Sequence, residues 1–214
     1  INYKVVNSCI CFLPTVNGKQ LIIVEDLVDK NGSLHPVQES MVKHHGSQCG
    51  FCTPGFVMSL FAMFKTNKAF TDSFIKESIA GNLCRCTGYQ PIVKAAKSLS
   101  GKNKKDEFHK NKKTIIKLLK KINKSDIAIY NKGNRYFAPL YLTELKKILK
   151  RNPEAKLVSG QTDVALEVTQ ERKNIDTMIY LNSISELNYI KSEKKYIEVG
   201  AATSLVDFQH FIEK

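Results

Sequence analysis

The chain has 214 residues, of which 43% are hydrophobic, and it carries a formal net charge of +13 at pH 7. This length has room for two domains, or for three small or incomplete ones. No apolar run is long enough to span a bilayer, so we expect a soluble, cytoplasmic protein that uses no membrane. Because the sequence opens at Ile1 without Met, we interpret it as a fragment or internal segment of a longer protein.

Residues 3 to 27 carry a strand pattern. Apolar runs at 9–13 and 20–24 flank Asn17-Gly18, and this dipeptide between apolar runs is a strong hairpin signal. The sequence therefore predicts a β-hairpin in a first domain at 1–34. Cys9 and Cys11 both lie in it.

A second domain is predicted at 35–98. A short helix leads to His44 and His45, and together with His35 these side chains could be metal ligands. Surface or hydrogen-bonded histidine is the favoured interpretation, because four cysteines follow closely in the sequence.

Those cysteines form two close pairs. After Pro54 the apolar residues recur at helical spacing, so Cys49 and Cys52 lie at a helix N-terminus, where free N–H groups and the helix dipole stabilise thiolates. Thr71-Asp72-Ser73 is predicted to start a second helix over 74–79, and a further helix is predicted after Pro91. The pattern indicates a small helical domain closed over Cys49, Cys52, Cys84 and Cys86.

Four sulfurs in this spacing allow several chemistries. An iron–sulfur cluster and a zinc ion both accept four thiolates, although zinc sites usually use two C-x2-C pairs. A redox dithiol would need only the first pair. Structural or reactive thiols also remain open. With this ligand pattern, the six cysteines favour a reducing compartment over a disulfide scaffold.

The stretch 99–132 is predicted to be a basic linker. A solvated linker is favoured over nucleic-acid binding, because no RNA-binding aromatic motif accompanies the charge. Apolar residues from Ile115 to Ile122 recur at helical spacing and predict an amphipathic helix, whose apolar face we expect to pack on the protein and not on a membrane. The lysines concerned are Lys102, Lys104, Lys105, Lys110, Lys112, Lys113, Lys117, Lys120, Lys121 and Lys124.

The last predicted domain covers 133–214. A helix around 142–149, capped by Thr143, precedes a strand at 155–159, a turn at Gly160 and a helix from Val164 to Thr169. A strand, a tight turn and a helix N-terminus together present N–H groups to an anion such as a pyrophosphate.

Two stretches, 45–60 and 81–92, resemble the helical [2Fe–2S] domain of the molybdenum hydroxylases. The His45-Gly46-Ser47 ahead of Gln48 is most similar to the xanthine dehydrogenases of that family. The resemblance implies that Cys49, Cys52, Cys84 and Cys86 ligate a [2Fe–2S] cluster. It also implies that Gln48 contacts the pterin of a molybdopterin cofactor held by a partner.

Residues 1–34 resemble the end of a plant-type ferredoxin domain of the β-grasp type. The resemblance implies that Cys9 is one ligand of a second [2Fe–2S] cluster, whose other ligands are missing from this sequence. We therefore expect that site to be empty in this chain. Cys11 matches no ligand, and we interpret it as a core thiol.

Residues 137–203 resemble the FAD-binding (PCMH-type) domain of the same family. Ser159 and Gln161 stand where many members have Gly. The loop that would wrap the flavin pyrophosphate comprises Leu157, Val158, Ser159, Gly160, Gln161, Thr162, Asp163 and Val164.

The resemblance implies an α+β multidomain fold: a partial ferredoxin domain, a four-helix cluster domain and the start of an FAD domain. It also implies an electron-transfer subunit of a xanthine dehydrogenase, with the molybdopterin on a large partner subunit and NAD as acceptor. No residue here would catalyse the hydroxylation, and the chain alone should be inactive. An aldehyde, carbon monoxide or nicotinate hydroxylase is the alternative, and a non-enzymatic zinc module is a further one.

Overall fold

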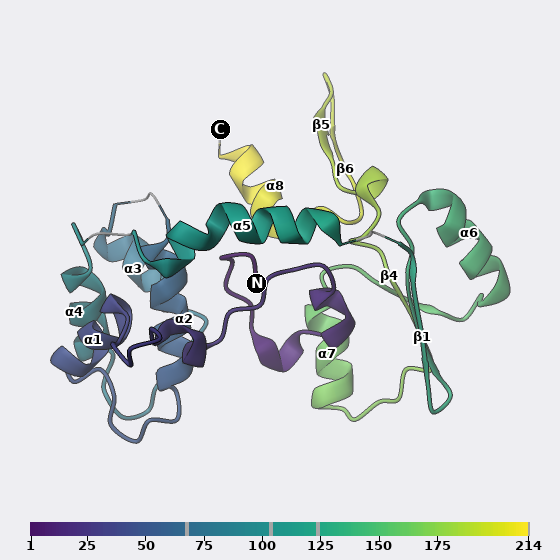
Figure 1. Ribbon diagram of the computed structural model, residues 1–214. Helices are drawn as coiled ribbons and strands as arrows, with labels where there is room; N and C mark the ends of the chain where they lie inside the picture. The colour runs from purple at the N-terminus through teal and green to yellow at the C-terminus, as the bar shows by residue number, and fades with distance from the viewer. Residues whose placement is uncertain (67–68, 103–104, 123–124, 214) are drawn as a thin grey trace. The chain divides into compact units, whose positions relative to one another are not determined.

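The computed structural model describes residues 1–66, 69–102, 105–122 and 125–213 (Figure 1). Lys104 and Lys124 of the predicted basic stretch lie outside these ranges. The chain divides into two compact units, Ile1–Asn7 with Val16–Ile122 and Ser8–Thr15 with Asn123–Lys214. None of the helices in the described ranges combines the length and apolar character needed to cross a membrane.

Four helices form the body of the first unit: α1 (Pro36–Lys43), α2 (Thr53–Phe64), α3 (Asp72–Ile79) and α4 (Gln90–Ser98). Most of α2 is buried, including Phe56, Leu60 and Phe64. A helix that is apolar on all sides must be surrounded, and α1 and α3 pack against α2 while α4 packs against both of them. The predicted four-helix domain is confirmed (Figure 1).

The helix starts follow local signals in the sequence. The Thr71 side chain accepts a hydrogen bond from the Phe74 N–H at the start of α3. Cys52 is the N-cap residue of α2, with Pro54 in the first turn. The position of the first cysteine pair at a helix N-terminus is therefore confirmed.

The hairpin predicted within residues 3–27 does not form, so that prediction was wrong. This region instead holds three short 3-10 helices, η1 (Ser8–Ile10), η2 (Leu13–Val16) and η3 (Val24–Leu27). Two strands alone are marginally stable unless a third strand or a helix covers them. Here Ile22 and Leu27 are buried against the helical core instead.

The amphipathic helix predicted in the basic stretch is α5 (Glu107–Lys121). It buries none of its residues, and Leu118 is 54% exposed, so the packing expected for its apolar face is absent from this described helix. Only its first turn reaches the core, where Phe108 packs edge-on against Phe61. The helix is thus anchored at one end.

The second unit is built on a four-stranded sheet with the order β1-β2-β4-β3. Strand β1 is antiparallel to β2, whereas β2 and β3 are both parallel to β4. Phe137, Leu145 and Ile179 belong to its core. The elements are β1 (Ile127–Asn131), β2 (Asn134–Ala138), α6 (Leu142–Arg151), β3 (Lys156–Val158), α7 (Thr162–Thr169) and β4 (Thr177–Tyr180).

The chain continues through η4 (Ser185–Leu187), an antiparallel pair β5 (Ile190–Ser192) and β6 (Ile197–Val199), and α8 (Leu205–Ile212). Thr143 was predicted to cap α6, and this was wrong. The N-cap residue is Tyr141, and the Leu142 N–H donates to the Glu186 carboxylate at 3.1 Å. A side chain distant in sequence thus satisfies the helix terminus.

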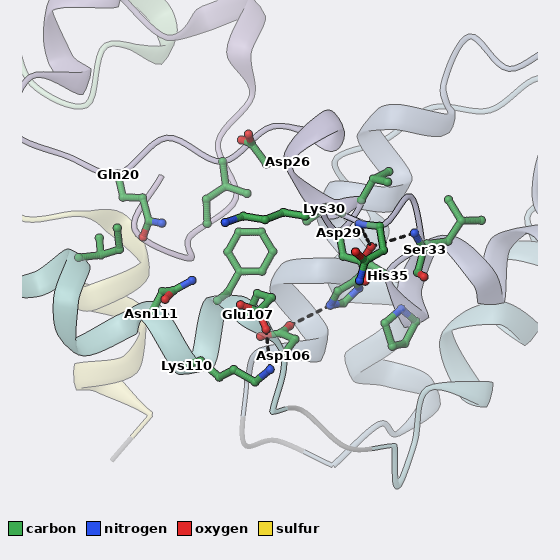
Figure 2. Close-up of a pocket in the computed structure, with 18 of the residues that line it drawn as sticks. Gln20, Asp26, Asp29, Lys30, Ser33, His35, Asp106, Glu107, Lys110 and Asn111 are labelled. Carbon is green, nitrogen blue, oxygen red and sulfur yellow. Dashed lines mark hydrogen bonds and ion pairs between the residues drawn. The ribbon is translucent and has the colours of Figure 1, made fainter.

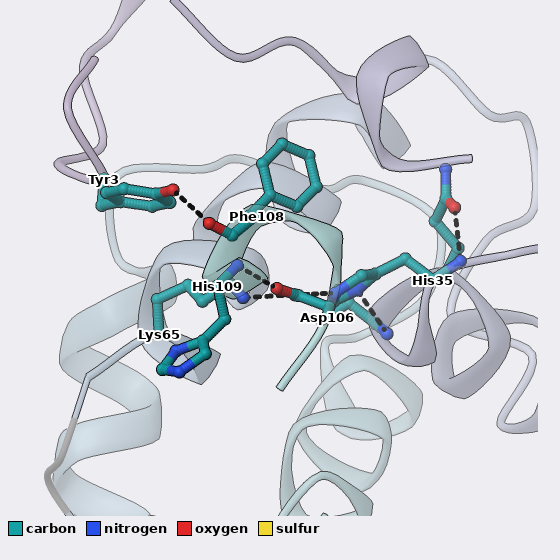
Figure 3. Close-up of polar contacts among 8 residues, drawn as sticks. Tyr3, His35, Lys65, Asp106, Phe108 and His109 are labelled. Carbon is teal, nitrogen blue, oxygen red and sulfur yellow. Dashed lines mark hydrogen bonds and ion pairs between the residues drawn. The ribbon is translucent and has the colours of Figure 1, made fainter. Parts of the chain in front are cut away.

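A largely buried polar network fixes the start of α5 to the beginning of α1 and the end of α2 (Figure 3). His35 Nδ1 accepts from the Val37 N–H, so its proton lies on Nε2, which is 2.9 Å from Asp106 Oδ2. Lys65 also pairs with Asp106, which in turn accepts from the His109 N–H. Burial raises the pKa of Asp106, but the bonds from His35 and Lys65 outweigh it and hold this pKa well below its usual range.

We expect Asp106→Asn to lower the free energy of unfolding by about 2 kcal/mol at pH 7, because it removes a charge that three groups solvate. A carboxyl with a lowered native pKa stabilises the fold above its unfolded pKa of about 4 and loses this effect as the pH falls. The difference in free energy of unfolding between wild type and Asp106→Asn, measured by urea titration, should therefore shrink below about pH 4. Asp72→Asn, which removes an exposed pair with Lys97, is the control and should change little.

Candidate functional site

The loop before Cys84 is held on the first turns of α2. Asn82 Nδ2 donates to the buried Ser59 Oγ at 2.7 Å. A Cβ atom on Gly55 would lie 2.6 Å from Asn82 Oδ1, so only glycine allows this approach. These contacts bring the second cysteine pair to the helix that follows the first.

The four sulfurs meet as two pairs. Cys86 Sγ lies 3.5 Å from Cys49 Sγ, and the thiols of Cys52 and Cys84 are hydrogen-bond partners. Cys84 is only 8% exposed, whereas Cys49 and Cys86 are open to solvent. The sequence-predicted set is therefore gathered at one place.

The surrounding groups favour thiolate at part of this set. The Thr87 hydroxyl and the N–H groups of Thr87 and Cys86 lower the pKa of Cys84 to about 7. The Phe51 N–H lowers the pKa of Cys49, whereas burial raises the pKa of Cys52. Metal ligation requires thiolates, and hydrogen bonds to sulfur stabilise them.

This donor set fits a two-iron centre, because four cysteine thiolates ligate a [2Fe–2S] cluster. Among the residues that the structure describes, no group of three or more His, Cys, Asp or Glu side chains is close enough together to hold a metal ion. His35, one alternative ligand, is engaged with Asp106. Two pairs of thiolates match the two irons of such a cluster.

The rim of the cysteine site is exposed and apolar. Phe51 is 96% exposed and Leu83 is 85% exposed, each next to a cysteine. Gln48 is also exposed on this rim. Its contact with a pterin stays a prediction.

The loop between β3 and α7 has an unusual backbone. Gly160 and Gln161 both have positive φ, at 72° and 74°. The Gly160 N–H donates to Asn182 Oδ1 at 2.8 Å, and Ser159 Oγ donates to the Ala201 carbonyl at 2.7 Å. These bonds hold the turn open at the N-terminus of α7, where free N–H groups attract anions.

The segment that carries Cys9 and Cys11 packs on this loop. Helix η1 contacts α7, and the Phe12 N–H donates to Gln161 Oε1 at 3.3 Å. Cys9 is exposed, whereas Cys11 is partly buried. Burial raises the pKa of the Tyr180 hydroxyl, and the nearby Cys11 thiol raises the Tyr180 pKa further. The side chain of Gln161 therefore has a structural partner that a glycine would lack.

A separate cavity of about 860 Å³ lies in the first unit and involves none of the cysteines (Figure 2). Two pairs of its charged or titratable groups lie within its own wall: Glu107 with Lys110, and Asp106 with His35. Asp29 accepts from the backbone N–H groups of Asn31 and Ser33. We assign no function to this cavity.

Two family models match the chain. Residues 23–97 match a [2Fe–2S] binding domain, and residues 129–214 match the FAD binding domain in molybdopterin dehydrogenase. The chain therefore joins a [2Fe–2S] binding domain to an FAD binding domain. It belongs to the molybdenum hydroxylase family.

Relatives match nearly the whole chain. Xanthine dehydrogenase 1 of Arabidopsis thaliana is 32% identical, and abscisic-aldehyde oxidase of the same plant is 33% identical, each over 98% of this chain. The chain spans about a fifth of the length of these relatives (19% and 18%). The solved quinoline 2-oxidoreductase from Pseudomonas putida 86 is 35% identical, covering 36% of this chain and 51% of that chain with a TM-score of 0.32.

We expect Gln161→Gly to release the segment 8–15, because glycine keeps the positive φ but removes the acceptor of the Phe12 N–H. Amide exchange at Phe12, followed at residue resolution, should become about fivefold faster. Gln170→Gly at the other end of α7 is the matched control and should leave Phe12 unchanged. Equal exchange rates of the Phe12 amide in wild type and in both variants would contradict a stabilising hydrogen bond between Gln161 and Phe12.

Proposed function

We propose that Cys49, Cys52, Cys84 and Cys86 hold a [2Fe–2S] cluster and that this chain is the electron-transfer part of a xanthine dehydrogenase. The observation that carries the proposal is the meeting of these four sulfurs in two pairs, inside the residues that match the cluster domain. The cluster would supply a one-electron redox centre. The protein supplies ligands, hydrogen bonds and burial that set its potential.

Hydroxylation of xanthine or hypoxanthine would take place at a molybdopterin on a large partner subunit, in a cytoplasmic hetero-oligomer. Water supplies the oxygen, and substrate and water together release two electrons and two protons. NAD⁺ takes both electrons and one proton to become NADH, and the second proton passes to solvent, so the reaction balances. The chain's residues take no part in the bond changes, and Gln48 on the exposed rim would contact the pterin.

The flavin would bind on the loop Leu157–Val164. The open turn at Gly160, held by Asn182 at the N-terminus of α7, suits a pyrophosphate. Cys9 would be one ligand of a second cluster, and its segment packs on this loop. We place the domains at 1–34, 35–98, 99–132 and 133–214.

An aldehyde-oxidising hydroxylase is the second candidate. The abscisic-aldehyde oxidase match, at 33% identity, is as high as the xanthine dehydrogenase match. The substrate pocket of such an enzyme would lie on the partner. The choice between the two substrates is therefore a matter for assay.

We expect the reconstituted chain to contain two irons and two acid-labile sulfides per chain and to be red-brown. Cys84→Ser should lose most of the iron and sulfide, because it removes a ligand. Cys11→Ser is the matched control and should keep both. One zinc without sulfide in the wild type would instead support the zinc module.

We expect the native complex, purified through this chain from its source cells, to contain molybdopterin and to reduce NAD⁺ when xanthine is added. The assay is run in parallel with an aldehyde. Activity with the aldehyde alone would favour the second candidate. If no molybdopterin-containing subunit co-purifies with the chain, both candidate functions would be contradicted.

A further inference from the structure

The loop between Cys84 and α4 is a closed set of hydrogen bonds that the cysteine pattern does not require. Thr87 Oγ1 lies 3.2 Å from Cys84 Sγ, and the Thr87 N–H points to the same sulfur at 3.5 Å. The Tyr89 N–H donates to Thr87 Oγ1 at 3.2 Å. The Cys84 N–H donates to the Tyr89 hydroxyl at 3.0 Å and closes the ring.

The direction of the bond between hydroxyl and sulfur follows from its partners. A ligating cysteine is a thiolate without a proton, so only Thr87 can donate. The Tyr89 N–H occupies a lone pair of the hydroxyl oxygen, which turns the hydroxyl proton away from Tyr89. The proton is therefore directed at Cys84.

The ring of bonds is fixed to the core of the first unit. The Tyr89 side chain packs edge-on against the buried Phe56, with ring centroids 6.1 Å apart. Tyr89 also has a positive φ of 68°, which this packing supports. Thr87 is thus held in place by its neighbours in the loop and by the core.

We propose that Thr87 is a positioning residue that raises the reduction potential of the cluster through its hydroxyl bond to Cys84. The inference rests on the proposed function. When a cluster takes up one electron, negative charge on the thiolate sulfurs increases. A hydrogen-bond donor stabilises the more negative, reduced form.

The test is a redox titration of the reconstituted full chain, with dithionite as reductant and electron paramagnetic resonance as the readout. Thr87→Val keeps the shape and the backbone N–H but removes the hydroxyl. At the wild-type midpoint potential, the ratio of reduced to oxidised cluster should fall about tenfold, which is about 59 mV for a one-electron couple. Thr87→Ser restores the donor and should return the ratio to within about twofold of wild type.

Thr53→Val is the matched control. Thr53 follows the ligand Cys52, but its hydroxyl bonds to Ser47 Oγ at 2.6 Å and not to sulfur, so the midpoint should stay at the wild-type value. If Thr87→Val fails to hold a cluster, the midpoint potential of Thr87→Ala is compared with that of Thr87→Ser in the same titration.

A wild-type midpoint in Thr87→Val and Thr87→Ala would overturn this inference alone, because the cluster would still be present. A shift of the same size in Thr53→Val would also overturn it. A wild-type chain without iron and sulfide would overturn the proposed function and this inference together.

Discussion

The cysteine site depends on the contact between α2 and the loop 81–89. Asn82 reaches Ser59 across Gly55, and Tyr89 packs against Phe56, so both ends of this loop are fixed to one helix. These contacts hold the loop that carries Cys84 and Cys86 against the helix that follows Cys49 and Cys52.

Much of the first unit could be predicted because its signals are local. The apolar spacing after Pro54 and the cap at Thr71 predict α2 and α3, and both helices form. The hairpin signal at Asn17-Gly18 was equally local but failed. A strand pair needs neighbours to cover it, and the sequence pattern of two strands does not say whether those neighbours are present.

The finer features of the site could not be predicted in the same way. Glu186 replaces Thr143 at the start of α6, and Asn182 holds Gly160, because side chains arrive from distant parts of the chain. Gln161 was visible in the sequence only as a departure from glycine. Its partner, Phe12, is 149 positions away, so only the folded chain could show why a long side chain stands there.

The chain passes between its two compact units three times, after Asn7, after Thr15 and after Ile122. The second unit is therefore discontinuous in sequence, because an eight-residue stretch from near the N-terminus is built into it. A protease that cuts only after Ile122 would leave both pieces non-covalently associated through that inserted stretch. Producing the flavin unit as a separate polypeptide would require this stretch to be supplied as well, by fusion or as a peptide.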